Sequence, residues 1–287
     1  ANALVDITAT ASVTTVTVDG FAGSSAIKDA TTNTALATIN LSNGTNMDID
    51  SAAATLALNL NNVTGTVDVK ANTTTINAKV DGDSTATIES ATVKTLNVTA
   101  GNGEFTADAS ATNELAAATA ISTVGFTGTA NVTLDGATTT YTGGAGVDNV
   151  TVADATTGAA IAKAIDLGAG DDKLILSGNA VKVPAVELKG GAGEDTLSIT
   201  ATSAALLDDN TLFAAKLNSF ERLELTAVNA QDINVKNLGF ANYVTVAGVT
   251  ANGTLTLNDL ANNATVVLNA TTGTGGLTTN IKDASTG

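Results

Sequence analysis

The sequence predicts an all-β protein, a right-handed parallel β-helix (β-solenoid) whose short strands stack in coils of roughly 22–24 residues. Three observations support this prediction. Apolar residues recur every eleven residues along much of the chain, glycine-rich turns recur at about twice that spacing, and only 3% of the 287 residues are aromatic. With 44% hydrophobic residues, the core must be filled mainly by Val, Ile, Leu and Ala, which suits a narrow solenoid.

The eleven-residue period is clearest in two stretches. Polar residues alternate with apolar ones inside each stretch, as expected of strands with one buried face. Two units of eleven make one coil, close to the spacing of the glycine-rich turns. The apolar tracks are Leu36, Met47, Leu58 and Val69 in the first stretch, and Ile233, Val244, Leu255, Val266 and Leu277, with Val235, Val246, Leu257 and Leu268, in the second.

Three glycine-acid turns organise residues 141–200, and each leads into a short apolar alternation. Their aspartates, Asp148, Asp172 and Asp195, are spaced by about one coil each, which would place the turns on one edge of consecutive coils. Glycine permits positive φ, and backbone carbonyls with carboxylates supply the about six to eight oxygens that Ca²⁺ takes. We therefore predict Ca²⁺ as a cofactor, with about two ions between the three turns and Asp172 bridging both.

The predicted ligands are the carbonyls and carboxylates of these turns, with the glycines that shape them. The alternative is that the aspartates only cap or solvate glycine-rich loops. The candidate metal site comprises Gly143, Ala145, Gly146, Asp148, Leu167, Ala169, Gly170, Asp171, Asp172, Gly190, Ala192, Gly193 and Asp195.

The remaining chain is expected to form solenoid coils with a few irregular segments. We predict three parts: a Thr/Ala/Asn-rich solenoid over 1–140, calcium-binding coils over 141–200, and a short helix followed by solenoid over 201–287. Residues 203–218 have helical spacing. Residues 22–35 are expected to be a loop or a short helix, and 113–121 one or two helical turns. Loops such as 155–159 and 178–183 would form the edge opposite the calcium turns.

Composition excludes several classes of function. Cysteine and histidine are absent, which removes disulfides, the usual zinc sites and His- or Cys-based catalysis. The net charge of −16 makes nucleic acid and anionic membrane surfaces poor partners. We find no apolar run long enough to span a bilayer and no signal-peptide pattern at the start. The missing initiator Met suggests a piece of a longer protein.

The glycine-acid turns resemble those of the RTX family of type I secreted proteins, although Leu167 stands where the second turn would have its first glycine. The segment Phe220-Glu221-Arg222-Leu223-Glu224-Leu225 is similar to a motif of RTX-type bacterial surface-layer proteins of the Caulobacter-like family. This resemblance implies a calcium-stabilised β-helix that self-assembles into a lattice on the cell exterior. It also implies anchoring, for example to cell-surface polysaccharide, through segments not recognisable here.

Three functions are compatible with these observations. The first is a structural surface-layer (S-layer) protein, the second a secreted RTX adhesin or biofilm-matrix protein, and the third a polysaccharide-acting β-helix enzyme. An enzyme would need a paired acid and base. The sole arginine, Arg222, is expected to form an ion pair with Glu221 or Glu224, so we expect no catalytic residues and a non-enzymatic role.

Overall fold

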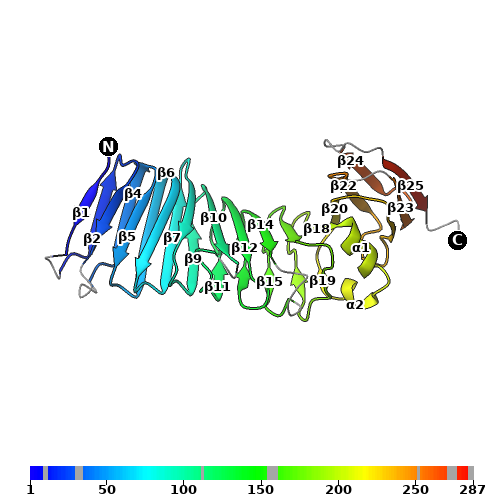
Figure 1. Ribbon diagram of the computed structural model, residues 1–287, viewed down its shortest axis with the longest axis horizontal. Coiled ribbons are helices and arrows are strands. Elements are labelled where there is room, and N and C mark those ends of the chain that lie inside the picture. Colours follow the sequence, from blue (N-terminus) through cyan, green and yellow to red (C-terminus); the bar gives the residue numbers. More distant parts are fainter. Residues whose placement is uncertain are drawn as a thin grey trace. The chain divides into compact units, whose positions relative to one another are not determined.

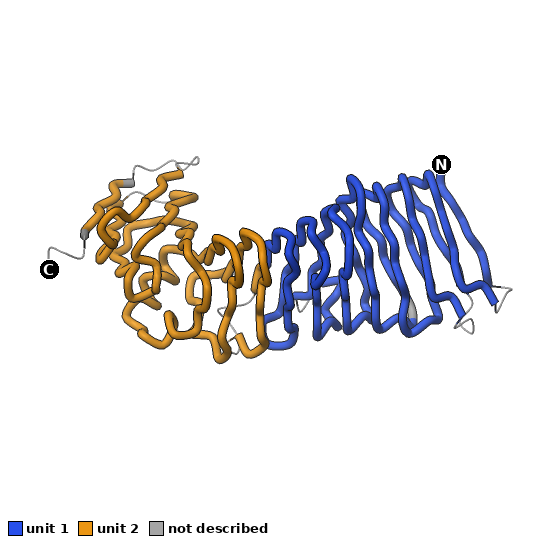
Figure 2. Tube along the Cα trace, turned by 180° about the vertical axis from the view of Figure 1, so that it is seen from behind, with its two compact units in different colours: residues 1–150 blue, residues 151–287 orange. Residues whose placement is uncertain are grey.

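A computed structural model of the chain describes residues 1–8, 12–29, 35–110, 113–153, 161–250, 253–269 and 277–283. These residues form stacked coils of parallel strands, a β-solenoid of about 11 turns with two short helices, which confirms the predicted fold class. The chain divides into two compact units, Ala1–Val150 and Thr151–Gly287 (Figure 2). This division lies inside the segment 141–200 that was predicted as a separate part.

The first unit is built from two parallel sheets that the chain visits in turn (Figure 1). One sheet contains β1, β3, β5, β8, β10 and β12, and the other contains β2, β4, β7, β9, β11 and β13, while β6 takes part in both. The strands are β1 (Leu4–Asp6), β2 (Thr15–Asp19), β3 (Ser25–Lys28), β4 (Thr38–Gly44), β5 (Met47–Ser51), β6 (Thr55–Ala71), β7 (Thr75–Asp81), β8 (Thr85–Glu89), β9 (Thr95–Ala100), β10 (Glu104–Ala109), β11 (Ala120–Ser122), β12 (Thr129–Leu134), β13 (Thr140–Thr142) and β14 (Val147–Val152).

The eleven-residue period is close to half a coil, since Met47 and Val67, which pair between successive coils of this stretch, lie 20 positions apart. Met47 and Val67 are paired in one sheet, whereas Leu58, between them in the sequence, lies in the other. Stacked core residues such as Ile27, Ile49 and Val69 are 0% exposed. Burying such a side chain stabilises the fold by about 1.5–3 kcal/mol. The narrow core therefore consists of aliphatic ladders that run from coil to coil.

Strand β6 shows that a coil can turn a corner without a loop. Its 17 residues pair with β7 from Thr55 to Asn61 and with β8 from Thr64 to Asp68. Asn62, between these halves, has a φ of 55°, and Gly65, the second residue of the half that pairs with β8, has a φ of 82°. Such left-handed backbone is tolerated by Asn and Gly, so the strand bends from one sheet into the next at these residues.

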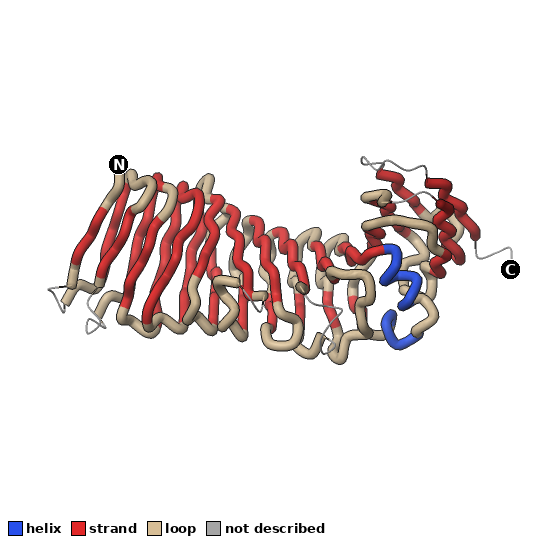
Figure 3. The backbone as a smooth tube through the Cα atoms, in the orientation of Figure 1, coloured by secondary structure: helices blue, strands red, loops and turns tan. Residues whose placement is uncertain are grey.

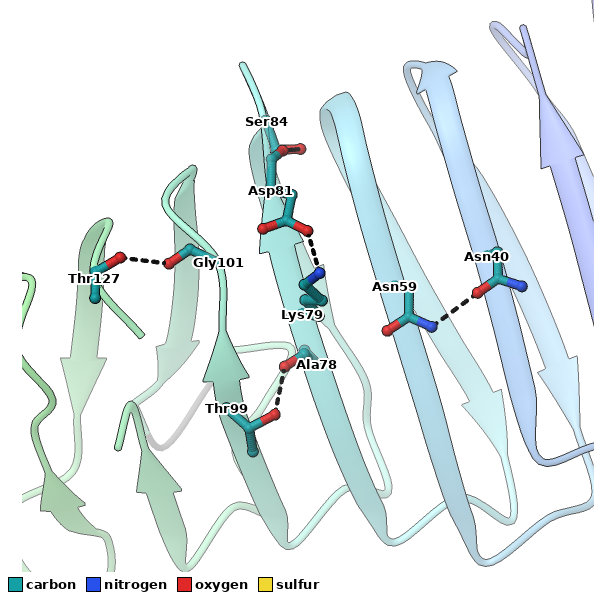
Figure 4. Close-up of polar contacts among 9 residues, drawn as sticks. All are labelled: Asn40, Asn59, Ala78, Lys79, Asp81, Ser84, Thr99, Gly101 and Thr127. Carbon is teal, nitrogen blue, oxygen red and sulfur yellow. Dashed lines mark hydrogen bonds and ion pairs between the residues drawn. The ribbon is translucent and has the colours of Figure 1, made fainter. Parts of the chain in front are cut away.

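Neutral side chains connect neighbouring coils on the outer face of the first unit (Figure 4). The Asn59 amide donates over 2.8 Å to Oδ1 of Asn40, the residue paired with it on the adjacent strand. The Thr127 hydroxyl donates to the Gly101 carbonyl over 3.0 Å. Such hydrogen bonds let polar residues on the solvent face contribute to stacking as well as solubility.

Two predictions for the first unit need correction. Within residues 22–35, Ser25–Lys28 is strand β3, neither loop nor helix, because Ile27 is needed as a core residue opposite Ile49; residues 30–34 lie outside the described residues. Residues 113–119 form two hydrogen-bonded turns and no helix: the Ala116 N–H donates to Asn113 O over 3.0 Å and the Ala118 N–H to Leu115 O over 2.8 Å, and strand β11 begins at Ala120.

The second unit is also built of stacked parallel strands and contains an inserted helical segment, drawn blue in Figure 3. Helix α1 is capped by Thr200, whose side chain accepts a hydrogen bond from the Ser203 N–H. The predicted helix within residues 203–218 is thus confirmed as two shorter helices. The elements are β15 (Ile165–Asp166), β16 (Lys173–Leu176), β17 (Leu188–Lys189), β18 (Thr196–Thr200), α1 (Ala201–Leu207), α2 (Thr211–Ala214), β19 (Leu217–Asn218), β20 (Arg222–Thr226), β21 (Asp232–Asn234), β22 (Tyr243–Ala247), β23 (Gly253–Leu260), β24 (Thr265–Asn269) and β25 (Leu277–Asp283).

The length of each coil in the second unit depends on the segment that connects its strands. The coil from Lys173 to its partner Thr196 is shorter than the coil from Thr196 to its partner Arg222, because the two helices are inserted in the latter. Beyond the helices the apolar residues of the second eleven-residue stretch again alternate between sheets. Val244 lies in the sheet of β20, β22 and β24, and Leu255 in the sheet of β21, β23 and β25.

Candidate metal centre

Two of the predicted glycine-acid turns lie directly on one another in the second unit. The first joins β15 to β16 and the second joins β17 to β18, and Ala169 and Ala192 form a parallel bridge between them. The Ala192 N–H donates to Gly168 O and the Gly170 N–H to Ala192 O, both over 2.9 Å. The equal spacing of turns and strands therefore produces a stacked pair of turns, as predicted for these two coils.

Glycine is required where the turns touch. A Cβ on Gly193 would lie 1.8 Å from Gly170 O, and one on Gly191 would lie 1.9 Å from Gly168 O. Gly193 also has a φ of 141°, a backbone conformation that side-chain-bearing residues rarely adopt. The glycines of the motif thus permit close backbone stacking of one turn on the next.

Asp172 and Asp195 both turn inward at the ends of these turns, at 2% and 0% exposure. The Asp172 N–H donates to Asp195 Oδ1 over 2.9 Å, so the second carboxylate reaches back to the first turn. Asp195 Oδ2 is buried and has no hydrogen-bond partner in the structure. Burial raises the pKa of Asp195, the Asp172 N–H lowers it, and the negative charges of Glu221 and Asp171 raise it further.

Other predicted ligands of the second unit take different positions. Asp171 is exposed, and its Oδ1 accepts a hydrogen bond from the Glu194 N–H over 3.0 Å. The Leu167 side chain is fully buried as a core residue, which explains an apolar residue at a glycine position of the motif. Of the predicted opposite-edge loops, 178–183 does connect β16 to β17, and 155–159 lies outside the described residues.

The turn around Asp148 belongs to the first unit and has a different environment. Asp148 is 1% exposed and accepts hydrogen bonds from the Tyr141 hydroxyl over 2.8 Å and from the Thr123 hydroxyl and the Gly144 N–H over 3.3 Å. Burial raises the pKa of Asp148, while these three donors lower it. This donor set matches the alternative prediction, in which the aspartate caps a glycine-rich turn.

The backbone of this turn, residues 143–148, packs against the preceding coil. The Ala145 N–H donates to Phe126 O over 3.2 Å, and a Cβ on Gly146 would lie 2.1 Å from Gly128 O. Sequence reasoning missed Thr123 and Tyr141 as partners of Asp148, because a hydroxyl on a Thr-rich strand is not distinctive.

The residues present at the second-unit turns fit a hard cation. A buried carboxylate oxygen without a partner costs free energy that a cation would offset, and carbonyls lie nearby. Among the residues that the structure describes, no three His, Cys, Asp or Glu side chains gather in a cluster able to hold a metal ion. An ion at these turns would therefore depend on backbone carbonyls together with one or two carboxylates.

The sole arginine does not pair with its sequence neighbours, which corrects the prediction. Arg222 forms its ion pair with Glu194 and lies 4.8 Å from the centre of the Tyr243 ring. Glu224 instead pairs with Lys173 over 2.8 Å, and Glu221 Oε2 accepts a hydrogen bond from the Asp195 N–H over 2.9 Å. Side chains on one face of the sheet stack from coil to coil, so their partners come from other coils and not from the residues next to them in the sequence.

Comparison with models of known protein families, with curated proteins and with solved structures gave no match to this chain. None of the helices in the described part of the chain is long and apolar enough to cross a membrane.

Proposed function

We propose that this chain is a structural protein of an extracellular surface layer, a β-solenoid that Ca²⁺ stabilises at its glycine-acid turns and that self-associates into a two-dimensional lattice. The observation that supports it best is the buried, unpartnered Oδ2 of Asp195 at the end of two turns stacked on successive coils. An unpaired buried carboxylate destabilises the fold, and a bound cation would stabilise its charge.

A structural role agrees with the use of the charged residues. Arg222 is engaged by Glu194 and Glu224 by Lys173, so the acidic and basic groups considered for catalysis have structural partners. Stacked coils with polar outer faces provide long, regular surfaces of the kind that repeat proteins use for association.

The cell exterior fits a site of this kind. With one or two carboxylates and several carbonyls, the site should bind Ca²⁺ with a dissociation constant of about 10⁻⁴–10⁻³ M, as extracellular calcium-binding modules do. Such a site would be filled only where Ca²⁺ is abundant. We therefore expect the calcium-stabilised protein to function outside the cell.

Thermal unfolding and electron microscopy of the purified protein, each in millimolar Ca²⁺ and in excess chelator, test this function. We expect a higher melting temperature and ordered arrays with Ca²⁺, and loss of both with chelator, because an ion that binds only the folded turns stabilises them by mass action. Calcium-dependent melting without arrays at any concentration would favour the secreted adhesin. Identical melting in both conditions would contradict the calcium role.

A further inference from the structure

The stack of turns continues one coil beyond the last glycine turn. Lys189 pairs with Asn218, and Thr196 pairs with Arg222, so the residues between Asn218 and Arg222 occupy the place of the next turn. Only three residues, Ser219, Phe220 and Glu221, fill this place, whereas six fill the turn before it. The shorter connection holds Glu221 directly against Asp195.

Glu221 forms hydrogen bonds with both the carbonyl and the N–H of Asp195. Its N–H donates to Asp195 O over 3.0 Å, and its Oε2 accepts from the Asp195 N–H over 2.9 Å. The Glu221 carboxylate is thereby fixed beside the residue whose Oδ2 is buried and unpartnered. Two acidic side chains are thus held together, and the neighbouring Arg222 forms its ion pair with Glu194.

The main-chain carbonyl of Ser219 provides a further oxygen near Asp195 Oδ2. Ser219 has a φ of 55°, and its carbonyl points at Gly190. A Cβ on Gly190 would lie 1.9 Å from Ser219 O and 2.7 Å from Asp195 Oδ2. Both oxygens therefore border one small space, which a glycine at position 190 leaves free of side-chain atoms.

We propose that Asp195 Oδ2, the Ser219 carbonyl and the Glu221 carboxylate form a binding site for a divalent cation at the end of the turn stack. A hard oxygen set that includes a main-chain carbonyl favours Ca²⁺ over Mg²⁺, which demands stricter octahedral geometry. The site deepens the proposed function, on which it rests, by assigning a ligand outside the glycine-acid motif. It makes the segment before β20 part of the calcium-dependent structure.

The Glu221 side of this site is open to solvent. Glu221 and Glu194 line an open cavity of about 410 Å³, shared with Phe220, Arg222 and Tyr243. Arg222 is held by Glu194 and by its stacking on Tyr243, which keeps the guanidinium off Glu221. The Glu221 charge therefore remains available to a cation that enters from solvent.

Calcium titration by calorimetry on the wild type and on Glu221→Gln tests the site, with Glu187→Gln as the matched control. Gln can still accept the hydrogen bond from the Asp195 N–H, so this variant removes the charge and keeps the contact. Glu187 is an exposed glutamate of the same unit that accepts from the Asn218 amide over 2.9 Å. We expect Glu221→Gln to lose one Ca²⁺ or to bind it about tenfold more weakly or worse, and Glu187→Gln to match the wild type.

Melting temperatures of the same proteins separate ligation from packing. A ligand role predicts that Glu221→Gln melts like the wild type in chelator and below it in Ca²⁺, with a much smaller difference in Mg²⁺. Equal losses in chelator and in Ca²⁺ would assign Glu221 a purely structural role and overturn the site. Unchanged Ca²⁺ binding by Glu221→Gln would do the same while leaving the proposed function intact. A wild type that binds no Ca²⁺ would overturn both.

Discussion

Replacing Asp195 by Asn should have opposite effects on stability without and with Ca²⁺. In the ion-free protein the change removes a buried negative charge whose Oδ2 has no partner, at a residue that is 0% exposed. Leaving such a polar atom unsatisfied costs about 1–3 kcal/mol. The Asn amide nitrogen would stand near Ser219 O and could donate to it, while Oδ1 keeps the bond from the Asp172 N–H.

With Ca²⁺ the sign reverses. An ion that binds only the folded wild type adds roughly 2.7 kcal/mol at a hundred times its dissociation constant, and an amide oxygen is a weaker ligand than a carboxylate. Asp195→Asn should therefore be more stable than the wild type by about 1–3 kcal/mol in chelator and less stable than it in saturating Ca²⁺. No contact that is independent of the ion produces such an inversion.

Urea unfolding monitored by circular dichroism, in chelator and in millimolar Ca²⁺, measures both differences. Asp166→Asn serves as the control, because the Asp166 side chain is 42% exposed and its ion pair with Lys189 spans 3.6 Å, an arrangement worth about 0–1 kcal/mol. The reasoning is refuted if Asp195→Asn shifts stability in the same direction and by the same amount in both conditions.

Three further predictions concern the turns and the helical segment. Gly193→Ala should destabilise the fold by more than about 3 kcal/mol, since its Cβ would lie 1.8 Å from Gly170 O. Gly20→Ala, at a φ of 70° with nothing within 4 Å of the added Cβ, should cost about 1 kcal/mol. Equal costs in urea unfolding would contradict the close stacking of the turns. Tyr141→Phe should cost about 1 kcal/mol or more, because the hydroxyl donates to the buried Asp148 carboxylate over 2.8 Å, and unchanged unfolding would oppose this. Burial and the charges of Asp209 and Asp232 raise the pKa of Asp208, while the Asn234 N–H lowers it. The folded state therefore holds this proton more tightly than the unfolded chain does. The free energy of unfolding should fall as the pH rises from about 4 through the raised pKa of Asp208. Asp208→Asn should flatten that part of the pH profile, and parallel profiles would refute the assignment.

The solenoid could be predicted because its core is simple. An aliphatic residue every half coil is sufficient to fill a narrow interior, so the spacing of Met47, Leu58 and Val69 identified both the fold and the alternation between sheets. The two stacked turns of the second unit were predictable for a similar reason, since equal spacing places them in register. Local pattern and global packing demand the same residues at these positions.

The partners of the buried carboxylates could not be predicted in the same way. Glu221 reaches Asp195 because a longer coil with inserted helices ends in a three-residue turn, and no periodic signal marks that length. Strand β3 was missed because Ser25–Lys28 is a short strand with one large apolar residue, Ile27. Register is set by the lengths of the connections as well as by the strands, so a contact between coils depends on features outside both partners.

The environments of Asp148 and Asp195 show why one motif can have two physical roles. Both aspartates end a glycine-acid turn and both are buried, yet Asp148 meets two hydroxyls and an N–H, whereas Asp195 has an oxygen without a donor beside a second carboxylate. A carboxylate that is satisfied by protein donors gains little from a cation, since ligation would have to replace those hydrogen bonds. What distinguishes the two is the residue that the neighbouring coil supplies, a hydroxyl for Asp148 and Glu221 for Asp195. Calcium dependence in this solenoid should therefore be concentrated at the second unit, and substitution of Thr123 by an acidic residue would be needed to extend it to the first.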